Sequence, residues 1–276
     1  MHYSELAAEL ETVAHELADA ARDSILPYFR QEFLEVESKE ENSWDPVTAA
    51  DREAESAMRK ILSSRRPNDG ILGEELEPVE GKTGLTWVLD PIDGTRGFLC
   101  GAPTWGVLIA VAAEKGPIFG IVDQPYTKER FVGGFGRCWM DGPSGRRNLQ
   151  VRTGKSLERA TLATTYPEIG TKAECAAFRR LADRVLLVRY GMDCYAYALL
   201  AAGQIDLVVE AGLKPFDAHA PIALVRAAGG IATDWNGNAA HAGGRMVAAA
   251  TESLHRVALE ELNGGLCRTP TLSLNS

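Results

Sequence analysis

Residues 90–95, Asp-Pro-Ile-Asp-Gly-Thr, combine residue types that could bind a metal ion and a phosphate. They follow the apolar run Trp87–Leu89, and a short apolar run stopped by Pro and Gly predicts a buried strand ending in a turn. Asp90 and Asp93 would share this turn, where carboxylates repel each other unless a cation lies between them. The Gly-Thr pair offers backbone N–H groups that could hold an anion. The turn therefore predicts a metal and a phosphate bound together.

Three further acidic clusters lie at the edges of predicted elements. They are residues 45–51, which include Asp51, the Gly73-Glu74-Glu75 segment, and residues 214–217, which end in Asp217. Hard divalent cations prefer such oxygen ligands, and Mg²⁺ in particular takes carboxylates together with substrate phosphate. The five histidines form neither an HxH nor an HExxH pattern, which weakens a zinc-hydrolase interpretation.

Composition bounds the class of protein. The 276 residues are 45% hydrophobic and 24% charged, ordinary values for a globular chain of one large domain or two subdomains. A net charge of −9 argues against a nucleic-acid partner. Five scattered cysteines without a CxxC suggest neither disulfides nor a zinc knuckle, so a reducing cytoplasm is the expected location. No transmembrane-length apolar run or signal-peptide pattern is found, so no membrane partner is expected.

The first half of the chain predicts a mixture of helices and antiparallel strands. Helical spacing of apolar residues predicts an amphipathic helix over 4–34 and a second over 49–64. Strands are predicted by short apolar or alternating runs at 71–73, 87–89, 105–113, 117–123 and 130–135. Residues 35–47 are predicted to be irregular, the stretch ending near Pro103 to be rich in turns, and residues 136–148 to be a loop.

The second half alternates strands and helices, which favours a layered α/β arrangement. The predicted strands are 160–165, 185–189, 205–210, 230–235 and 245–250. The predicted helices are 172–183, 193–203, 217–228 and 251–263. We therefore expect an N-terminal subdomain, 1–150, that carries most of the metal ligands, and a C-terminal subdomain, 151–276, that carries Asp217 and the residues that select the substrate.

These motifs together carry a family resemblance. Gly73-Glu74-Glu75, the 90–95 turn, and Asp217 before an apolar helix that ends in Ala228-Gly229-Gly230 resemble the inositol monophosphatase family over roughly residues 5–260. The resemblance implies a five-layered αβαβα sandwich of the inositol monophosphatase/fructose-1,6-bisphosphatase type. It also implies a homodimer and a Mg²⁺-dependent phosphomonoesterase activity on a small phosphorylated substrate.

The resemblance further implies a site with two to three Mg²⁺ ions. Glu74, Asp90 and the carbonyl of Ile92 would hold the first ion. Asp90, Asp93 and Asp217 would hold the second, and Glu74 would reach a third through waters. Two cations roughly 3.5–4 Å apart can clamp the attacking and leaving oxygens of an in-line displacement. One of them makes hydroxide available near neutral pH by lowering the pKa of its bound water.

The catalytic residues implied are Glu74, Thr95 and Asp51. Thr95 and Asp51 would pair, and the Thr95 hydroxyl would help to orient the attacking water. The N–H groups of Gly94 and Thr95 would bind the phosphate. Asp51 has a simpler alternative role, because together with Thr48 it could cap the second helix. Glu75 is expected to be solvated, which is the usual fate of adjacent glutamates.

Within the family, the chain looks most like the histidinol-phosphate phosphatase branch. The segments that carry this likeness are Thr95–Phe98, Pro103–Ile109, Tyr190–Tyr197 and Asp206–Asp217. Histidinol phosphate carries an ammonium and an imidazole, and Asp193 and Glu210 are the expected anionic partners for them. Glu210 has an equivalent in inositol phosphatases, so Asp193 carries most of the discrimination. N-capping of the following helix is an almost equally good role for Asp193.

Two alternatives stay open at this stage. The same metal chemistry could serve inositol 1-phosphate or another small phosphate ester such as a nucleoside bisphosphate. A non-catalytic scaffold or regulatory protein is disfavoured, because every carboxylate of the expected metal site is present. The chain departs from the branch at Asp217-Ala218-His219-Ala220-Pro221, where Pro221 is expected in a first helical turn and His219 is expected to be structural or solvent-exposed rather than catalytic.

Overall fold

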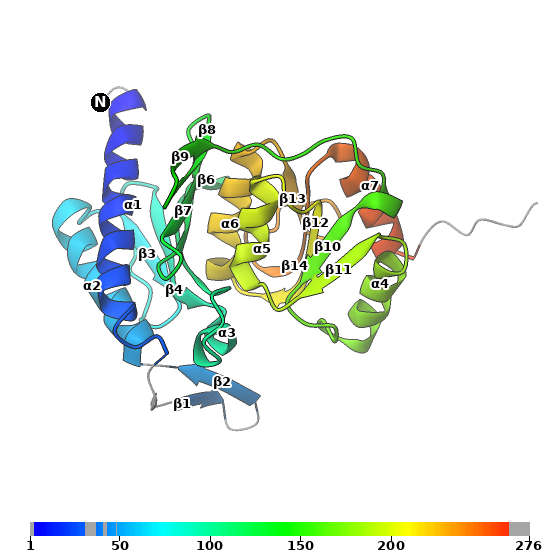
Figure 1. The fold of residues 1–276 in the computed structure, drawn as a ribbon. Coiled ribbons are helices and arrows are strands. Elements are labelled where there is room, and N and C mark those ends of the chain that lie inside the picture. The colour runs from blue at the N-terminus through cyan, green and yellow to red at the C-terminus, as the bar shows by residue number, and fades with distance from the viewer. Residues whose placement is uncertain (1–2, 31–36, 41–42, 48, 265–276) are drawn as a thin grey trace, which may run out of the picture.

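Five layers of secondary structure are stacked in the computed structural model, which describes residues 3–30, 37–40, 43–47 and 49–264 (Figure 1). The two outer layers and the central layer are helical, and a β-sheet lies in each gap between them. The helical layers consist of α1 (Tyr3–Ile25) with α2 (Ala49–Arg65), α5 (Asp193–Ala201) with α6 (Pro215–Ala227), and α4 (Lys172–Ala182) with α7 (Glu252–Leu262). This confirms the predicted αβαβα sandwich.

The first sheet has seven strands in the order β3-β4-β5-β6-β7-β8-β9. Their bounds are β3 (Gly70–Gly73), β4 (Thr86–Asp93), β5 (Gly106–Ala113), β6 (Gly116–Gln124), β7 (Glu129–Gly134), β8 (Arg137–Gly142) and β9 (Gly145–Asn148). Strands β3 and β4 are parallel and the remaining neighbours are antiparallel. Because parallel strands end at the same edge, the segment after β3 emerges beside the end of β4.

The second sheet has five strands in the order β11-β10-β12-β14-β13. Their bounds are β10 (Thr161–Thr164), β11 (Leu187–Tyr190), β12 (Leu207–Leu213), β13 (Ile231–Thr233) and β14 (Gly244–Ala249). A 3₁₀ turn, η1 (Leu157–Arg159), precedes β10. The boundary between the two sheets falls between β9 and β10, but apolar side chains of both sheets enclose α5 and α6 in one core cluster. The division into subdomains 1–150 and 151–276 stays a prediction.

Helix α6 lies unusually close to the first sheet. A side chain at Gly120 of β6 would put its Cβ 2.9 Å from the Cα of Ala220, and one at Gly133 of β7 would lie 2.6 Å from the Cα of Leu224. Glycines at these two positions therefore let the helix backbone approach the strands. This approach carries the first turn of α6, which holds Asp217, toward the end of β4 (Figure 1).

Four predicted elements need correction. Helix α1 ends at Ile25 rather than at residue 34, because Pro27 disfavours helix at the residue before it and supplies no N–H. Residues 31–34 lie outside the described residues. The irregular stretch 35–47 contains an antiparallel pair, β1 (Glu37–Glu40) and β2 (Ser43–Val47). The turn-rich stretch contains a short helix, α3 (Thr95–Leu99).

The fourth correction is the predicted loop at 136–148, which is the β8–β9 hairpin. Strand β9 is exposed along its whole length and has the sequence Gly-Arg-Arg-Asn, so it lacks the apolar alternation by which a strand is recognised. The guanidinium groups of Arg137 and Arg146 lie 5.0 and 5.2 Å from the ring centre of Trp139 and cover it. The loop prediction was wrong because the arginines of this hairpin, although polar in sequence, pack on an aromatic ring as part of a strand pair.

Candidate active site

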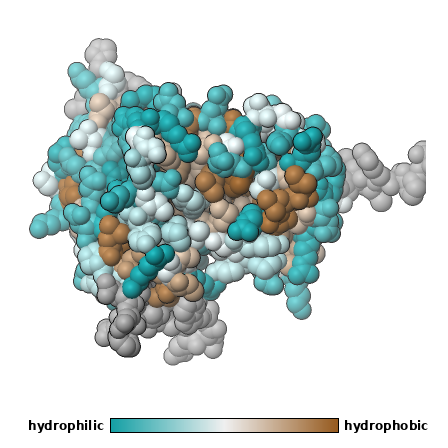
Figure 2. Space-filling view, viewed as in Figure 1, coloured by the Kyte–Doolittle hydropathy of each residue, from teal (hydrophilic) through white to brown (hydrophobic). Residues whose placement is uncertain are grey.

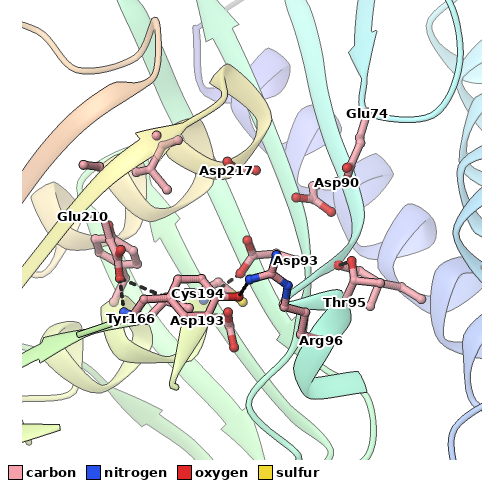
Figure 3. Close-up of a pocket in the computed structure, with 17 residues that line it drawn as sticks. Glu74, Asp90, Asp93, Thr95, Arg96, Tyr166, Asp193, Cys194, Glu210 and Asp217 are labelled. Atoms are coloured by element: carbon pink, nitrogen blue, oxygen red, sulfur yellow. Dashed lines mark hydrogen bonds between the residues drawn. The ribbon is translucent and has the colours of Figure 1, made fainter. Parts of the chain in front are cut away.

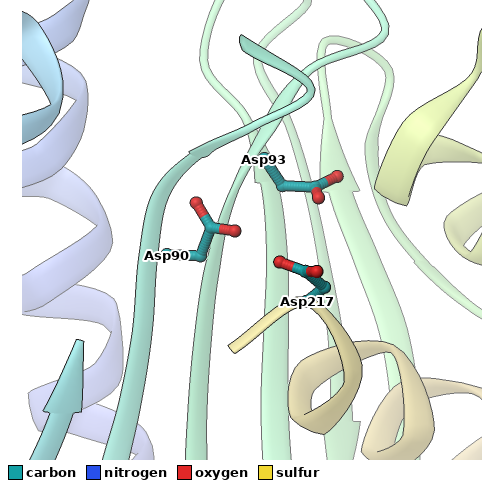
Figure 4. A group of neighbouring side chains, drawn as sticks. All are labelled: Asp90, Asp93 and Asp217. Carbon is teal, nitrogen blue, oxygen red and sulfur yellow. The ribbon is translucent and has the colours of Figure 1, made fainter. Parts of the chain in front are cut away.

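Asp90 and Asp93 lie at the end of β4, as predicted, and they point toward Asp217 (Figure 4). The pairing of β4 with β5 shifts register between Asp90 and Asp93. Such irregularities re-aim side chains at strand ends. One carboxylate oxygen from each of Asp90, Asp93 and Asp217 lies within 4.8 Å of the others. The structure therefore brings together three acidic residues that are up to 127 positions apart (217 − 90) in the sequence.

Asp217 is fixed by the start of α6. Its carboxylate accepts a hydrogen bond of 2.7 Å from the backbone N–H of Lys214, the residue that precedes the helix. This is the reciprocal half of a capping box, in which a carboxylate in the first turn satisfies the N–H of the N-cap residue. One Asp217 oxygen thus orients the side chain while the carboxylate faces the end of β4.

The electrostatics of this cluster favour a cation. Asp90 is 1% exposed, and its Oδ1 is buried without a hydrogen bond among the described residues. Burial and the neighbouring carboxylates, Glu74 first, raise the pKa of Asp90 well above its usual range. Burial, Asp217 and Asp193 raise the pKa of Asp93 in the same way. A hard divalent cation would relieve this repulsion, and an all-oxygen donor set suits Mg²⁺.

Glu74 directly follows β3, and its backbone N–H donates to the carbonyl of Leu89 in β4 at 3.2 Å. The parallel pairing of the two strands therefore sets its side chain beside Asp90 (Figure 3). Glu75 departs from the sequence prediction. Its side chain is only 2% exposed and lies 3.7 Å from Arg52, so the expectation of a solvated glutamate was wrong.

The remaining residues of the turn are also in place. Ile92 is buried, and its carbonyl accepts a hydrogen bond of 3.1 Å from the Thr95 hydroxyl. A carbonyl has two lone pairs, so this bond leaves Ile92 able to serve a metal as well. Gly94 has a φ of 84°, a value that favours glycine, and it precedes α3. Gly94 and Thr95 both line the pocket, and their N–H groups are candidate phosphate donors.

Asp51 lies in the first turn of α2 and is 2% exposed. Its charge is among those that raise the pKa of Asp90, so it lies within electrostatic reach of that carboxylate. The pairing of Thr95 with Asp51 stays a prediction. Thr48, the alternative helix cap, lies outside the described residues.

Asp93 also connects the two halves of the chain. It accepts a hydrogen bond of 2.7 Å from the backbone N–H of Cys194, in the first turn of α5. The N-cap of α5 is Met192, which makes no side-chain capping bond, so Asp193 is not the N-cap. The Asp93 carboxylate satisfies a backbone N–H at the start of α5, so the Asp193 side chain is not needed as the helix cap.

Asp193 and Glu210 face the same pocket of about 290 Å³, which the metal-site carboxylates also line (Figure 3). Burial raises the pKa of Asp193 to about 6, although Arg96 lowers it. Burial raises the pKa of Glu210 to about 7, against the lowering effect of Thr165. The backbone N–H and hydroxyl of Thr165 donate to the same Glu210 oxygen at 2.6 and 3.0 Å.

Comparison with known proteins identifies the family of the chain. The family model described as "Inositol monophosphatase family" matches residues 6–266. The chain belongs to the inositol monophosphatase family. It is 40% identical over 262 residues to the Arabidopsis thaliana protein named "Bifunctional phosphatase IMPL2, chloroplastic", covering 91% of this chain and 74% of that one. It is 32% identical over 260 residues to a "Histidinol-phosphatase" from Chlorobaculum parvum, covering 92% and 96%.

The fold is likewise that of the family. The solved structure of an inositol monophosphatase from Zymomonas mobilis matches with a TM-score of 0.82 and 38% identity, over 95% of this chain and 99% of that one. The chain is therefore a phosphatase of a metal-dependent phosphomonoesterase family, and its cluster of three carboxylates fits that chemistry. The relatives bear both histidinol-phosphatase and inositol-phosphatase names, so they do not choose the substrate.

Arg96 and Tyr166, which line the pocket in contact with each other, were not recognised from the sequence as site residues. Arg96, in α3, donates a hydrogen bond to the Tyr166 hydroxyl, and its guanidinium carbon lies 4.9 Å from the centre of the Tyr166 ring. Tyr166 comes two residues after β10, at the carboxyl end of the strand. Ligands commonly bind at such strand ends, and that position was the available signal.

The unusual segment after Asp217 is explained by where α6 begins. The helix starts at Pro215, so Pro221 lies in its second turn rather than its first, which corrects the sequence prediction. Pro221 offers no N–H to the carbonyl of Asp217. His219 is buried, its Nδ1 lies 2.8 Å from the carbonyl of Pro215, and its ring packs against that of His241. These contacts agree with a structural role for His219, and its burial contradicts the solvent-exposed alternative.

Proposed function

We propose that this protein is a Mg²⁺-dependent phosphatase that hydrolyses histidinol phosphate to histidinol and phosphate. The observation that carries the metal-dependent chemistry is the convergence of Asp90, Asp93 and Asp217, with Asp90 buried among like charges. Glu74 and the carbonyl of Ile92 would complete the ligand set for two to three ions. When bound, Mg²⁺ would activate a water and neutralise the leaving oxygen.

The chain's own residues would arrange the reactants around these ions. The Thr95 hydroxyl, together with Asp51 and Glu74, would orient the attacking water. The N–H groups of Gly94 and Thr95 would receive phosphate oxygens, since backbone donors at a left-handed turn suit an anion. Phosphoryl transfer depends on positioning and charge stabilisation, so no protein nucleophile is required.

The choice of histidinol phosphate rests on two further carboxylates of the pocket. Asp193 and Glu210 both face it, and a substrate with an ammonium and an imidazole offers a donor to each. Thr165 already holds one oxygen of Glu210, which fixes the direction in which the other oxygen can accept. The named histidinol-phosphatase relative is consistent with this choice.

Inositol 1-phosphate is the second candidate, and one observation favours it. Arg96 lowers the pKa of Asp193, so Asp193 already has a cationic neighbour in the protein. A neutral polyol needs hydrogen bonds but no counter-charge, and such a partly neutralised pocket could serve it. The Zymomonas mobilis structure belongs to an inositol monophosphatase.

A phosphate-release assay separates these functions. Histidinol phosphate, inositol 1-phosphate and an adenosine bisphosphate would each be supplied with Mg²⁺ or with EDTA. We expect Mg²⁺-dependent phosphate release, with the highest kcat/KM for histidinol phosphate. Preference for another ester would retain the metal site and overturn the substrate, while no release from any ester would favour a scaffold.

Assembly and surroundings also remain proposals. A homodimer is supported by exposed apolar side chains on and beside the edge strand β11, where Leu186 is 70% and Leu187 49% exposed. Figure 2 shows apolar surface gathered where β11 lies in Figure 1. No helix in the described part of the chain is long and apolar enough to span a membrane. A cytoplasmic location and the lack of a nucleic-acid partner stay predictions.

A further inference from the structure

The segment after β3 carries Glu74, and a buried residue on another element holds it. Glu55, on α2, is 0% exposed and lies beneath this segment. One of its oxygens accepts the N–H of Glu75 at 2.7 Å. The other accepts the N–H of Leu76 at 3.3 Å. The two residues directly after Glu74 are therefore anchored to one carboxylate.

Arg59 adds hydrogen bonds to the carbonyl groups of the same segment. Its Nε donates to Glu55 at 2.7 Å, one helical turn away on α2. Its two terminal nitrogens donate to the carbonyls of Leu76 and Glu77, each at 2.9 Å. The Glu55–Arg59 pair thus binds both the N–H and the C=O groups of the backbone that follows Glu74.

The same carboxylate explains the glycine before Glu74. A Cβ added at Gly73 would lie 2.0 Å from Oε1 of Glu55, far inside van der Waals contact. Gly73 has no positive φ to account for it, so close approach of the carboxylate is the constraint. The Gly-Glu-Glu sequence and Glu55 therefore form one structural unit.

We propose that Glu55 is a positioning residue for the metal site, acting through the backbone that sets Glu74. The inference rests on the proposed function, in which Glu74 binds Mg²⁺. A carboxylate only accepts hydrogen bonds, and both Glu55 oxygens face N–H donors. The isosteric change Glu55→Gln places an NH₂ group against one of these donors. The buried segment then shifts to escape that contact, and Glu74 shifts with it.

The test is Mg²⁺ binding to the intact protein by isothermal titration calorimetry. Residues that orient metal ligands typically contribute about 10- to 100-fold in affinity. We expect Glu55→Gln to weaken Mg²⁺ binding by about that range. Glu53→Gln, an exposed change on the same helix, is the matched control and should leave the affinity unchanged. An affinity within twofold of wild type in folded Glu55→Gln protein would overturn the inference.

Asp90→Asn distinguishes this failure from failure of the metal site. If Asp90→Asn abolishes Mg²⁺ binding and Glu55→Gln does not change it, the site stands and the positioning role falls. If neither change affects binding, the metal site itself is wrong, and the positioning role is lost with it.

A kinetic measurement separates positioning from general destabilisation. In the positioning role, saturating Mg²⁺ restores the kcat of Glu55→Gln, because every ligand is still present, while Asp90→Asn is not restored. A kcat that stays low at saturating Mg²⁺ would contradict the role. Should Glu55→Gln fail to fold, Arg59→Lys keeps the charge but loses the forked contacts to the segment. It should weaken Mg²⁺ binding in the same direction, and unchanged binding would again overturn the inference.

Discussion

The carboxylates of the pocket form two groups, which differ in the partners that the protein gives them. In the first group, Asp90, Asp93 and Asp217 converge, and burial together with the neighbouring carboxylates raises the pKa of Asp90 and Asp93. In the second group, Asp193 has Arg96 nearby and Glu210 has two hydrogen bonds from Thr165. The first group needs a cation from outside the chain. The second keeps raised pKa values, about 6 for Asp193 and about 7 for Glu210, but it has partners in the protein, which suits selection among substrates rather than binding of a bare ion.

The largest expected effect comes from replacing a carboxylate of the first group. Asp90→Asn or Asp217→Asn should reduce turnover to background while the fold survives, because each removes an expected metal ligand. In EDTA, Asp90→Asn should also raise the melting temperature, since it removes a charge from a buried cluster of like charges. Phosphate release and thermal unfolding measure the two effects. Full activity in either variant would refute the metal assignment.

A substrate-dependent effect is expected in the second group. Asp193→Asn should raise the KM for histidinol phosphate by about 10- to 100-fold, which corresponds to the free energy that a hydrogen bond to a charged group contributes. The KM for inositol 1-phosphate should change much less, because inositol carries no cation. Asp183→Asn, an exposed change on the surface, is the control. Equal effects on both substrates would remove Asp193 from the specificity argument.

Glu210 offers a pH test that needs no substrate. Burial raises its pKa from 4.5 to about 7, so folded protein retains a proton that the unfolded chain has lost. This group's contribution to stability is therefore lost as pH rises from 4.5 through about 7. Glu210→Gln stays neutral, so its stability relative to wild type should increase by up to about 3 kcal/mol over that window.

Urea unfolding in EDTA between pH 5 and pH 8 would measure this difference. The change with pH is the observable, because loss of one acceptor oxygen shifts the variant by a constant amount. A difference that does not vary with pH would mean that Glu210 is already ionised in the folded protein, as a carboxylate poised for a cation would be.

The parts of the site also differ in how far the sequence predicted them. The acidic turn at 90–95 was recognisable because its residues are contiguous and follow an apolar run, and the αβαβα fold followed from the family resemblance. Asp217 was found by the same resemblance. The contacts of Glu55 with Glu75, or of Arg96 with Tyr166, join residues 20 and 70 positions apart and leave no local pattern. The β9 strand was missed because its exposed polar residues carry no periodicity.

The smallest expected effect tests whether Arg96 acts as the protein's partner for Asp193 in the second group. Arg96 is exposed, and exposed ion pairs contribute only about 0.2–1 kcal/mol. Arg96→Gln should therefore lower the KM for histidinol phosphate by about two- to fivefold, because it removes a cation that competes with the substrate for Asp193. The KM for inositol 1-phosphate should not fall. Tyr166→Phe is the matched control, since it removes the hydrogen bond to Arg96 but keeps the charge.

The opposite result would be equally informative. If Arg96→Gln raises the KM for both esters, Arg96 binds the phosphate they share rather than compensating Asp193. Arg96 lies directly after Thr95, so its side chain would then extend the phosphate site that begins at Gly94. The division of the carboxylates into a metal-site group and a group with partners in the protein would then have to be redrawn, with Arg96 assigned to the metal and phosphate site.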